Sequence, residues 1–469
     1  MSSSSMNIQI QDKLTPFGHE MRKHFLFSPS YKPLNHGSFG AFPSPVRVAQ
    51  RHWQDELEQH PDTYIRYTYP PLLDKSRKVL ADLVNVDVDE VVLVPNATTA
   101  TNTVLRGIKW EEGDVIVYFE TVYGALEKTV EYVCETTLAE SEKVDAEWPI
   151  SDEELLQAFE KTIQEINEED KGKRRVRIAL FDTICSLPGV RMPWERLVEI
   201  CREHGVLSCI DGAHGVGQIP LDLGCIKPDF FCSNLHKWLF TPRGCALFYV
   251  PFRNQDLIRS SVPTSHGFVP LPSAKPSNIN NPFPPSSKSR FVYMHEFIGT
   301  TDDSPYLCIP TALEFREKVC GGEEAIMRYC HQLAAEGGKK AADILGTEIM
   351  DNPEGTLTRE TAFTNILLPL NIVESANDLT PLNPRTTAEH RTSFPAIPRG
   401  DVLSICQWMA KKSALEHQTF LAIIFYKGRL WWRLSAQVYL EVEDIVWGAV
   451  MCKKLCGEIV KGTWREEED

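Results

Sequence analysis

The sequence lacks the features that identify several classes of protein. No apolar run in its 469 residues reaches the roughly 18 residues that a membrane-spanning helix needs, and the opening MSSSSMNIQIQDKL has no apolar stretch typical of a secretory signal. Lys and Arg number 49 against 64 Asp and Glu, so the net charge of -15 argues against a nucleic-acid-binding surface. The thirteen cysteines include no C-x-x-C pair. We therefore expect free thiols in a reducing compartment, the cytoplasm by default, and no metal site.

What the chain does contain is an alternation of apolar runs and amphipathic stretches. Residues 90–108, EVVLVPNATTATNTVLRGI, predict a strand that turns into a helix, and residues 113–133 and 175–205 repeat that order. This alternation predicts an α/β fold. We expect an N-terminal segment (1–30), a large domain (31–310) and a smaller C-terminal α+β domain (311–469). Two Pro-rich segments, 271–290 and 376–401, are predicted to be loops.

Two charged side chains follow strand-like runs in the middle of this pattern. The run VLSCID ends in Asp211 and breaks into the glycine turn GAHGVG, and PDFFCSNLHKW brings Lys237 just past the next apolar run. Because the carboxyl ends of strands in an open α/β sheet form its ligand crevice, both groups are expected to face one cleft. A lysine that forms a Schiff base and a carboxylate that pairs with a protonated pyridine nitrogen are what a pyridoxal 5'-phosphate (PLP) site needs. A surface lysine is the alternative, and the position of Lys237 after a buried strand argues against it.

Three further segments offer groups that a phosphorylated aromatic cofactor would use. In PNATTATNT a strand gives way to a helix, so backbone amides and the hydroxyls of Thr98 and Thr99 converge where an anion is favoured; an ordinary helix cap is the alternative. Tyr123, in FETVYGALEK, could lie over a planar cofactor or serve as an acid or base, or it could be a packed core tyrosine. In FDTICSLPG, Asp182 and Ser186 end another strand. Each signal is weak alone, and their order along the chain strengthens them.

The segments LNHGSFG, NATTATNTVL, IDGAHGVG and SNLHKWLFTPRG, in this order, resemble the class V aminotransferase family of fold-type I PLP enzymes. The resemblance spans about residues 30 to 455 and implies a large domain with a mostly parallel seven-stranded sheet plus a smaller C-terminal domain. It implies that Lys237 is the Schiff-base lysine and Asp211 the partner of the pyridine nitrogen. Positions that match the family's phosphate site are Thr98, Thr99, Ser233, His236 and Thr300.

The same resemblance assigns further residues. Thr300 would reach across from a second subunit, which implies a homodimer. Ser186 would approach the phenolic oxygen of the cofactor, and His214, where relatives often have glutamine, could donate to that oxygen but is titratable near neutral pH. Arg433, in LWWRLSAQ, would grip the α-carboxylate of an amino-acid substrate. The remaining matches are Asn35 and His36 in a substrate-side turn and Tyr123 as a proton donor to the leaving group.

More narrowly, LHKWLFTPRGCALFYVPFRNQDLIRSSVPTSHGFVP is similar to fungal carbon–sulfur lyases of ergothioneine biosynthesis and to a sister fungal group, typified by loline-alkaloid pathways, that builds carbon–carbon bonds. We expect β-elimination from a cysteine-sulfoxide-type amino acid that releases a sulfenic acid, pyruvate and ammonia, with bond formation as the alternative. An aminotransferase or an epimerase ranks behind both. The substrate pocket is predicted from residues that could also be ordinary packing: Tyr64, Arg66, Tyr67 and His266.

Two other functions fit less well. Cysteine desulfurases carry a nucleophilic cysteine shortly before the carboxylate-binding arginine, and EHQTFLAIIFYKGRLWW, before Arg433, contains none. A cofactor-free scaffold on the same fold has no physical need for a lysine at a buried strand end.

Overall fold

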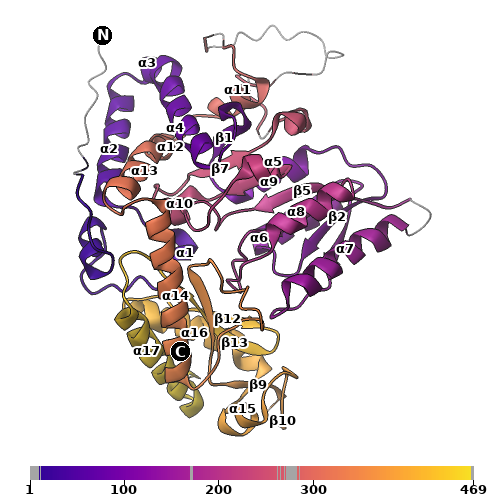
Figure 1. Cartoon of the computed structure of the whole chain (residues 1–469), viewed down its shortest axis with the longest axis vertical. Helices are drawn as coiled ribbons and strands as arrows, with labels where there is room; N and C mark the ends of the chain where they lie inside the picture. The colour runs from indigo at the N-terminus through magenta and orange to yellow at the C-terminus, as the bar shows by residue number, and fades with distance from the viewer. Residues whose placement is uncertain are drawn as a thin grey trace.

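The computed structural model describes residues 10, 12–168, 173–260, 262–264, 266–268, 270, 283–284, 286–375 and 377–465. Its largest element is a seven-stranded sheet of order β1-β7-β6-β5-β4-β2-β3, in which β3, β2, β4, β5 and β6 are parallel and β7 alone runs the other way (Figure 1). The predicted fold class is confirmed. The strands are β1 (Val91–Val94), β2 (Asp114–Phe119), β3 (Glu140–Val144), β4 (Arg175–Asp182), β5 (Leu207–Asp211), β6 (Phe230–Ser233) and β7 (Ala246–Tyr249).

Both faces of this sheet are covered, which explains why its strands are continuous apolar runs. All six residues of β2 are buried. Val115 and Val117 pack into one apolar cluster, whereas Ile116 packs into another, because successive side chains of a strand point to opposite faces. Helices of this part are α1 (His36–Phe39), α2 (Ser44–Gln59), α3 (Pro61–Thr63), η2 (Tyr64–Thr68), α4 (Tyr69–Leu83), η3 (Val88–Glu90), α5 (Ala97–Gly107), α6 (Gly124–Thr136), α7 (Asp152–Glu168), α8 (Trp194–Glu203), α9 (Leu223–Ile226), α10 (Leu235–Trp238), η5 (Phe252–Leu257), α11 (Arg290–Glu296), α12 (Ser304–Leu307) and α13 (Ile309–Lys318).

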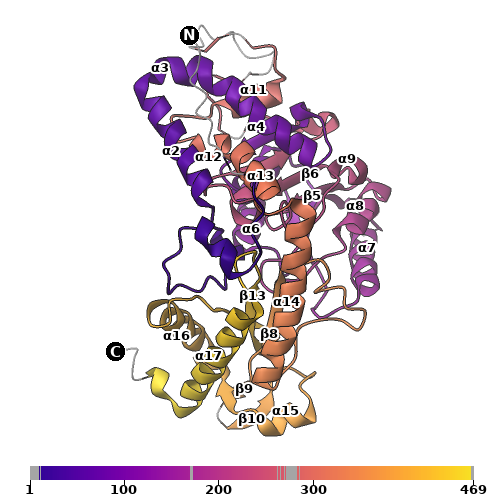
Figure 2. The ribbon, with the colours of Figure 1, turned by 60° about the vertical axis from the view of Figure 1, so that its left-hand side comes forward.

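The C-terminal part is built on two three-stranded sheets, of order β12-β13-β8 and β10-β9-β11. The long helix α14 runs from the large sheet down along this part and packs beside α17 (Figures 1 and 2). Its elements are α14 (Glu323–Leu345), β8 (Phe363–Leu367), β9 (Asn371–Ser375), β10 (Asp378–Pro381), α15 (Ala388–Ser393), β11 (Ala396–Pro398), η6 (Arg399–Asp401), α16 (Val402–Leu415), β12 (Ala422–Tyr426), β13 (Arg429–Ser435), α17 (Val442–Lys461) and η7 (Thr463–Arg465).

One loop prediction is wrong and another cannot be assessed. The segment 376–401 holds β10, α15, β11 and η6 rather than a loop, because Asn371 donates to three backbone carbonyls at residues 390, 391 and 394 and so ties the segment to β9. Residues 271–282 and 285, most of the other predicted loop, lie outside the described residues. The domain boundaries at 30 and 310 stay predictions.

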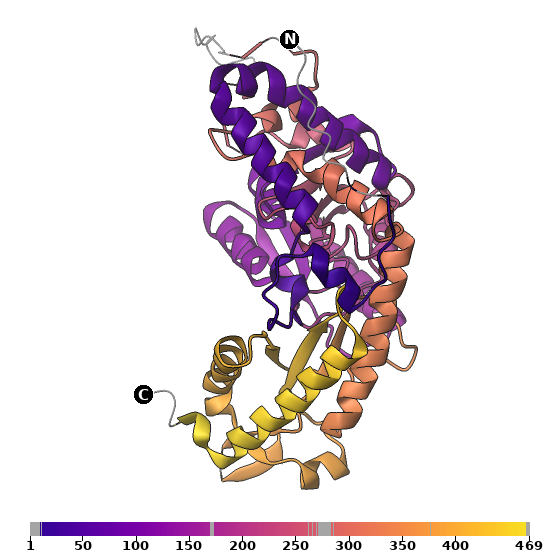
Figure 3. The same cartoon turned by 90° about the vertical axis from the view of Figure 1, so that its left-hand side faces the viewer.

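Residues 17–35 lie between the two parts of the molecule (Figure 3). This stretch includes the short helix η1 (His19–His24), and β-bridges join Lys32 to Thr419 and Asn35 to Ser435. These bridges bring the turn that begins at Asn35 against β13. No helix of the described residues is long and apolar enough to cross a membrane.

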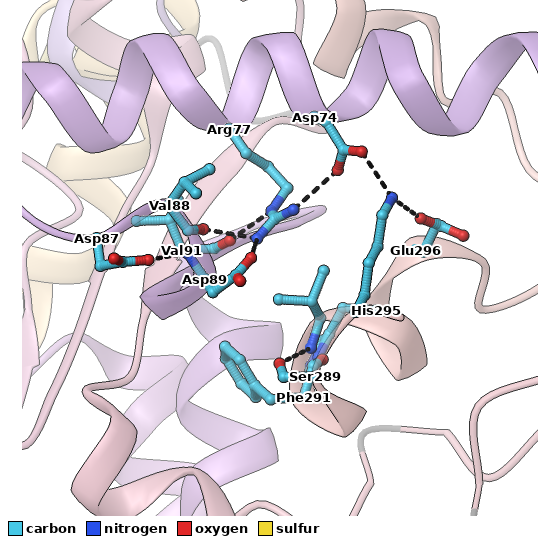
Figure 4. Close-up of polar contacts among 12 residues, drawn as sticks. Asp74, Arg77, Asp87, Val88, Asp89, Val91, Ser289, Phe291, His295 and Glu296 are labelled. Atoms are coloured by element: carbon cyan, nitrogen blue, oxygen red, sulfur yellow. Dashed lines mark hydrogen bonds and ion pairs between the residues drawn. The ribbon is translucent and has the colours of Figure 1, made fainter. Parts of the chain in front are cut away.

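A network of hydrogen bonds and ion pairs joins α4 to the start of β1 and to the end of α11 (Figure 4). The buried Arg77 donates to the carbonyls of Val88 and Val91, at 2.6 and 2.8 Å, and to the carboxylates of Asp74 and Asp89, at 2.8 and 2.9 Å. Lys288 pairs with Asp74 on α4, at 2.8 Å, and with Glu296 at the end of α11. Together they fix α4 against the edge of the large sheet, and α11 against α4.

Candidate active site

Two carboxylates stand side by side at the carboxyl edge of the large sheet. Asp182 ends β4 and Asp211 ends β5, and the two are direct partners in the parallel register. Both are buried, at 3% and 2% exposure, and the Asp211 Oδ1 accepts a 2.9 Å hydrogen bond from the amide of Ala213. Burial raises the pKa of Asp211, against the opposing effects of the Ala213 amide and Lys237. Burial, reinforced by Asp211, raises the pKa of Asp182 well above its ordinary value.

Lys237 lies one strand further along, in the turn of helix that follows β6. Its Nζ lies 3.2 Å from Nε2 of His214, and Nδ1 of His214 accepts a 3.1 Å hydrogen bond from the indole of Trp238. Burial lowers the pKa of Lys237 to about 8, whereas Asp211 acts in the opposite direction. Burial lowers the pKa of His214 well below its ordinary value, and Lys237 and Arg433 add to this. The site thus holds a weakly basic amine beside a neutral imidazole.

The glycine turn after β5 lets α10 approach this edge. Gly217 has a φ of +85°, and a Cβ there would stand 2.8 Å from the backbone of Trp238, so only glycine fits. Ser233, the last residue of β6, is fully buried, and its hydroxyl accepts a 3.0 Å hydrogen bond from the amide of Val216. In the described structure, the Ser233 hydroxyl therefore holds the turn. Its contact with a phosphate stays a prediction.

The N-terminus of α5 lies next to the lysine segment. The Asn96 side chain caps it, accepting from the amide and the hydroxyl of Thr99 at 2.8 and 3.0 Å, and the Asn234 Oδ1 accepts from the amide of Ala97 at 2.9 Å. This second bond ties the start of α5 to the residue that precedes α10. Thr98 and Thr99 are both partly exposed in the first turn of an eleven-residue helix, where an anion is favoured.

His236 belongs to the same short helix, α10, as Lys237. Its Nδ1 lies 3.1 Å from the carbonyl of Cys245, and no partner of Nε2 is found among the described residues. Burial lowers the pKa of His236 to about 4. A neutral imidazole with its Nδ1 bound to a carbonyl leaves Nε2 as a hydrogen-bond acceptor. Its predicted role at a phosphate would therefore need a protonated group on that phosphate, and it stays a prediction.

Arg433 comes from β13 of the C-terminal part and reaches the large sheet. Its Nη1 donates to the carbonyl of Ser186 at 2.7 Å, and its Nη2 donates to Asn35 Oδ1 at 2.7 Å and Ser38 Oγ at 2.9 Å. The guanidinium lies 4.7 Å from the centre of the Phe363 ring, and burial lowers the pKa of Arg433 to about 10. Its Nε–H finds no partner among the described residues. The structure thus brings together the predicted residues Arg433, Asn35 and Ser186.

His36 is buried and bonds to other parts of the protein, whereas a contact with substrate would require an open position. It is 4% exposed, its Nδ1 lies 2.6 Å from the Tyr439 hydroxyl, and its Nε2 makes a short hydrogen bond to the carbonyl of Lys237. Burial lowers its pKa to about 3. In the described structure, His36 supports the backbone that carries Lys237, and its predicted contact with substrate stays a prediction.

Other predicted residues lie away from Lys237 or at the surface. The ring of Tyr123, at the start of α6, is 47% exposed. Tyr64 and Thr300 line one pocket of about 50 Å³, and Lys237 is not part of its lining. Arg66 pairs with Asp62, and Tyr67 is 63% exposed.

His266 is also placed by the structure. It is 5% exposed and lies 3.8 Å from Glu296, and its ring centre is 4.1 Å from that of Tyr293. These neighbours belong to α11 or its end, so His266 packs against that helix. Its predicted role, like those of Tyr64, Arg66 and Tyr67, stays a prediction.

The residues at the sheet edge fit PLP. Lys237 supplies a weakly basic amine for covalent attachment and Asp211 a buried carboxylate for a pyridinium nitrogen, and the N-terminus of α5 supplies amides and hydroxyls for a phosphate. His214 presents a ring nitrogen beside the amine. No group of three His, Cys, Asp or Glu side chains suited to a metal ion is found in the described part of the chain.

Comparison with known proteins agrees with this site. The aminotransferase class-V profile matches residues 70–266. The chain is 37% identical to the L-cysteine desulfhydrase-like protein lolT1 of Epichloe uncinata, over 96% of this chain and 98% of that protein. It is 28% identical to hercynylcysteine sulfoxide lyase of Schizosaccharomyces pombe, over 94% and 98% respectively. A solved C-DES variant with glycine covalently linked to its PLP cofactor superposes with a TM-score of 0.68 at 15% identity, over 92% of this chain and 98% of that one, which shows a shared fold.

The fold is that of a fold-type I PLP enzyme. The chain belongs to the class-V aminotransferase family. The predictions of the family, of an enzyme and of PLP as its cofactor are confirmed.

Sequence reasoning did not assign roles to several residues of the site. Asp182 ends its strand just as Asp211 does, so the signal was present in FDTICSLPG, but nothing there reveals that the two carboxylates are register partners. Trp238 and Ser38 carry no local signal, because their partners, His214 and Arg433, lie 24 and 395 residues away in the chain.

Proposed function

We propose that this protein cleaves a carbon–sulfur bond of a cysteine-derived amino acid, of the cysteine-sulfoxide type, by β-elimination. The observation that carries the proposal is the joint presence of Lys237 Nζ, the Asp211 carboxylate and a buried Arg433 at one edge of the sheet. Relatives named as a cysteine desulfhydrase-like protein and a sulfoxide lyase support it. The products would be pyruvate, ammonia and, from a sulfoxide, a sulfenic acid.

The proposed residues divide the work by their chemistry. Bound PLP would supply an electron sink for negative charge at the substrate α-carbon. Lys237 would hold the cofactor and, once free, take the α-proton at Nζ, for which its lowered pKa suits it. Asp211 would hold a proton on the pyridine nitrogen.

Arg433 would bind the substrate carboxylate. Its partners Ser186, Asn35 and Ser38 hold the guanidinium in one orientation, and its unpartnered Nε–H adds a donor to the planar fork. Tyr123, exposed at the start of α6, would deliver a proton to the departing sulfur group.

We also propose a homodimer whose sites are shared. Thr300 is exposed and lines a pocket with Tyr64 that does not include Lys237. A second subunit could therefore receive Thr300 at the phosphate end of its own site. Sedimentation should give twice the chain mass, and a mixture of Lys237→Ala and Thr300→Lys chains should regain activity that neither variant has alone.

One experiment tests the reaction. The purified protein is supplied with an S-substituted cysteine sulfoxide or with L-cysteine, and pyruvate and sulfide are measured. Pyruvate from the sulfoxide supports the proposal. Pyruvate and sulfide from L-cysteine alone would instead assign the activity named for the relatives. A protein that binds PLP and releases no pyruvate from either would refute carbon–sulfur cleavage.

That last outcome would favour the second candidate, bond formation between a PLP-bound amino acid and a carbon partner in a fungal alkaloid pathway. The observation in its favour is the 37% identity to lolT1, against 28% to the sulfoxide lyase. Incorporation of the carbon skeleton of the amino acid into a larger product would distinguish it from elimination.

A further inference from the structure

His214 lies between two nitrogen atoms that set its proton. Its Nδ1 lies 3.1 Å from the indole Nε1 of Trp238, and its Nε2 lies 3.2 Å from Nζ of Lys237. The ring is 1% exposed, and these two atoms are the side-chain partners found for its nitrogens among the described residues. Each ring nitrogen therefore has one neighbour, and the chemistry of those neighbours decides where the proton sits.

The indole of Trp238 can only donate. Nδ1 of His214 must then offer its lone pair, because an N–H on Nδ1 would face the N–H of the indole. A neutral imidazole carries one N–H, so the proton of His214 lies on Nε2. The doubly protonated ring is excluded for the same reason.

The Nε2–H of His214 is therefore directed at Nζ of Lys237. A hydrogen bond there requires a lone pair on Nζ, which an uncharged amine has and an ammonium group lacks. With Trp238 in place, the 3.2 Å contact favours the uncharged form of Lys237. If the indole were absent, His214 could move its proton to Nδ1 and accept from a lysine ammonium through Nε2.

The position of Trp238 is itself rigid. Its side chain is 2% exposed, and its ring meets that of Phe363 edge to face at 5.4 Å between centres. The carbonyl of Trp238 accepts a 2.8 Å hydrogen bond from Arg316. The indole cannot turn away from His214 without breaking this packing.

The charged and titratable groups around the pair act in known directions. Arg433, His236 and His36 face His214 and disfavour its charged form. Asp211 and Asp182 face Lys237 and favour its charged form, whereas Arg433 disfavours it. The hydrogen bond from His214 therefore opposes the two carboxylates.

We propose that Trp238 is a positioning residue that fixes the Nε2–H tautomer of His214 and thereby favours the uncharged amine of Lys237, the form that attaches PLP and accepts a proton. This inference rests on the proposed function, in which Lys237 is the reactive amine. Its test can be made on the chain without cofactor, so it does not depend on turnover.

The experiment measures the pH dependence of acetylation of Lys237 by acetic anhydride, followed by mass spectrometry of its peptide, in the full-length chain freed of cofactor. Trp238→Phe removes the indole N–H. We expect the midpoint of labelling to rise by about one pH unit, and the labelling rate near neutral pH to fall about tenfold, as the loss of one hydrogen bond would give. Circular dichroism checks that the variant folds. Benzothienylalanine at position 238, which keeps the shape of the indole and lacks its N–H, replaces Trp238→Phe if that variant does not fold.

Two controls separate the tautomer from simple packing. Trp110→Phe makes the same change at another buried indole, whose N–H donates to the carbonyl of Leu105, so its midpoint should match the wild type. His214→Leu has no polar atom that could bond to either neighbour, so adding Trp238→Phe to it should cause no further shift. An unchanged midpoint in Trp238→Phe, or an equal shift in the His214→Leu background, would overturn the inference.

The failure of the proposed function has a separate signature. Borohydride reduction makes a Schiff base between PLP and a lysine permanent. If Lys237→Ala still bound PLP covalently after reduction, Lys237 would not be the attachment site, whatever the acetylation experiment shows. If Lys237→Ala attaches none and Trp238→Phe shifts nothing, the proposed function stands and the role of Trp238 fails.

Discussion

The pair of carboxylates at the sheet edge leads to a prediction about stability. Asp182 is 3% exposed, and no hydrogen bond to its carboxyl group is found among the described residues. Burial and the neighbouring Asp211 raise its pKa well above the ordinary value of 3.8. Asp182→Asn replaces it with a neutral side chain of the same shape, whose amide could donate to Asp211. We expect this variant to be more stable than the wild type at neutral pH.

The sign follows from proton counts. Above pH 3.8 the carboxyl group of Asp182 ionises in the unfolded chain, while in the folded chain it keeps its proton up to its raised pKa. The folded state then binds more protons, so this residue lowers the free energy of unfolding as pH rises, by about 1.4 kcal/mol for each pH unit between the two pKa values. Below the pKa of the unfolded state, Asp182 is protonated in both states and does not change the free energy of unfolding. Between the two pKa values, it lowers that free energy more at each higher pH. Asp182→Asn has no such loss.

Thermal unfolding of the wild type and Asp182→Asn, compared at several values between about pH 4.5 and 7, checks this slope. The difference between their midpoints should widen steadily with pH. Within this range the infrared band of protonated carboxylic acids should be weaker in Asp182→Asn than in the wild type, because burial and Asp211 raise the pKa of Asp182. Asp256→Asn is the matched control, because the Asp256 side chain is fully exposed. A difference between Asp182→Asn and wild type that stays constant across the range would mean that Asp182 is ionised in the fold, and would refute the reasoning.

Three further predictions concern other contacts. Lys237→Ala should lower pyruvate release by about a hundredfold to ten-thousandfold, the usual contribution of a general base. It should also abolish covalent PLP attachment. Ordinary turnover in this variant would exclude Lys237 as the reactive amine. Arg433→Lys loses the planar guanidinium that bonds to Ser186, Asn35 and Ser38. Steady-state kinetics should show a kcat/KM about 10- to 100-fold lower, mainly because KM rises. An effect on kcat alone would argue against carboxylate binding by Arg433. Arg77→Met should lower the free energy of unfolding by about 2 kcal/mol, because it removes the donor to the backbone carbonyls of Val88 and Val91, whereas Asp74 keeps its pair with Lys288 and Asp89 is half-exposed. Lys128→Met, at an exposed pair with Glu131, should leave the unfolding midpoint unchanged, and an equal loss in both variants would contradict a special role for Arg77.

The sequence predicts the parts of this site that depend on strand order. Asp211 and Lys237 follow apolar runs of a parallel sheet, and the carboxyl ends of such strands share one edge, so their proximity needs no further information. The position of His36 could not be predicted in this way. Its bonds to Tyr439 and to the carbonyl of Lys237 join residues 403 and 201 positions apart, and only the packing of three segments puts them together.

The segment 376–401 shows a different limit. Its prolines and polar residues indicate a loop, but Asn371 binds the carbonyls of residues 390, 391 and 394, and β11 pairs in parallel with β9. Tertiary hydrogen bonds thus override a composition that disfavours regular structure. The pocket around Tyr64 and Thr300 could not be predicted either, because its walls come from segments more than 200 residues apart.

The environment of Arg433 links substrate binding to the way the chain is assembled. The guanidinium belongs to β13, yet its partners are Ser186, after β4 of the large sheet, and Asn35 and Ser38, in the N-terminal turn that bridges to Ser435. Two other segments of the chain therefore hold it before any substrate arrives. A side chain already held in place loses little conformational entropy when a carboxylate binds, which strengthens binding without a new contact. Asn35→Ala should thus raise KM even though Arg433 remains, and a KM unchanged in that variant would show that Arg433 does not need this support.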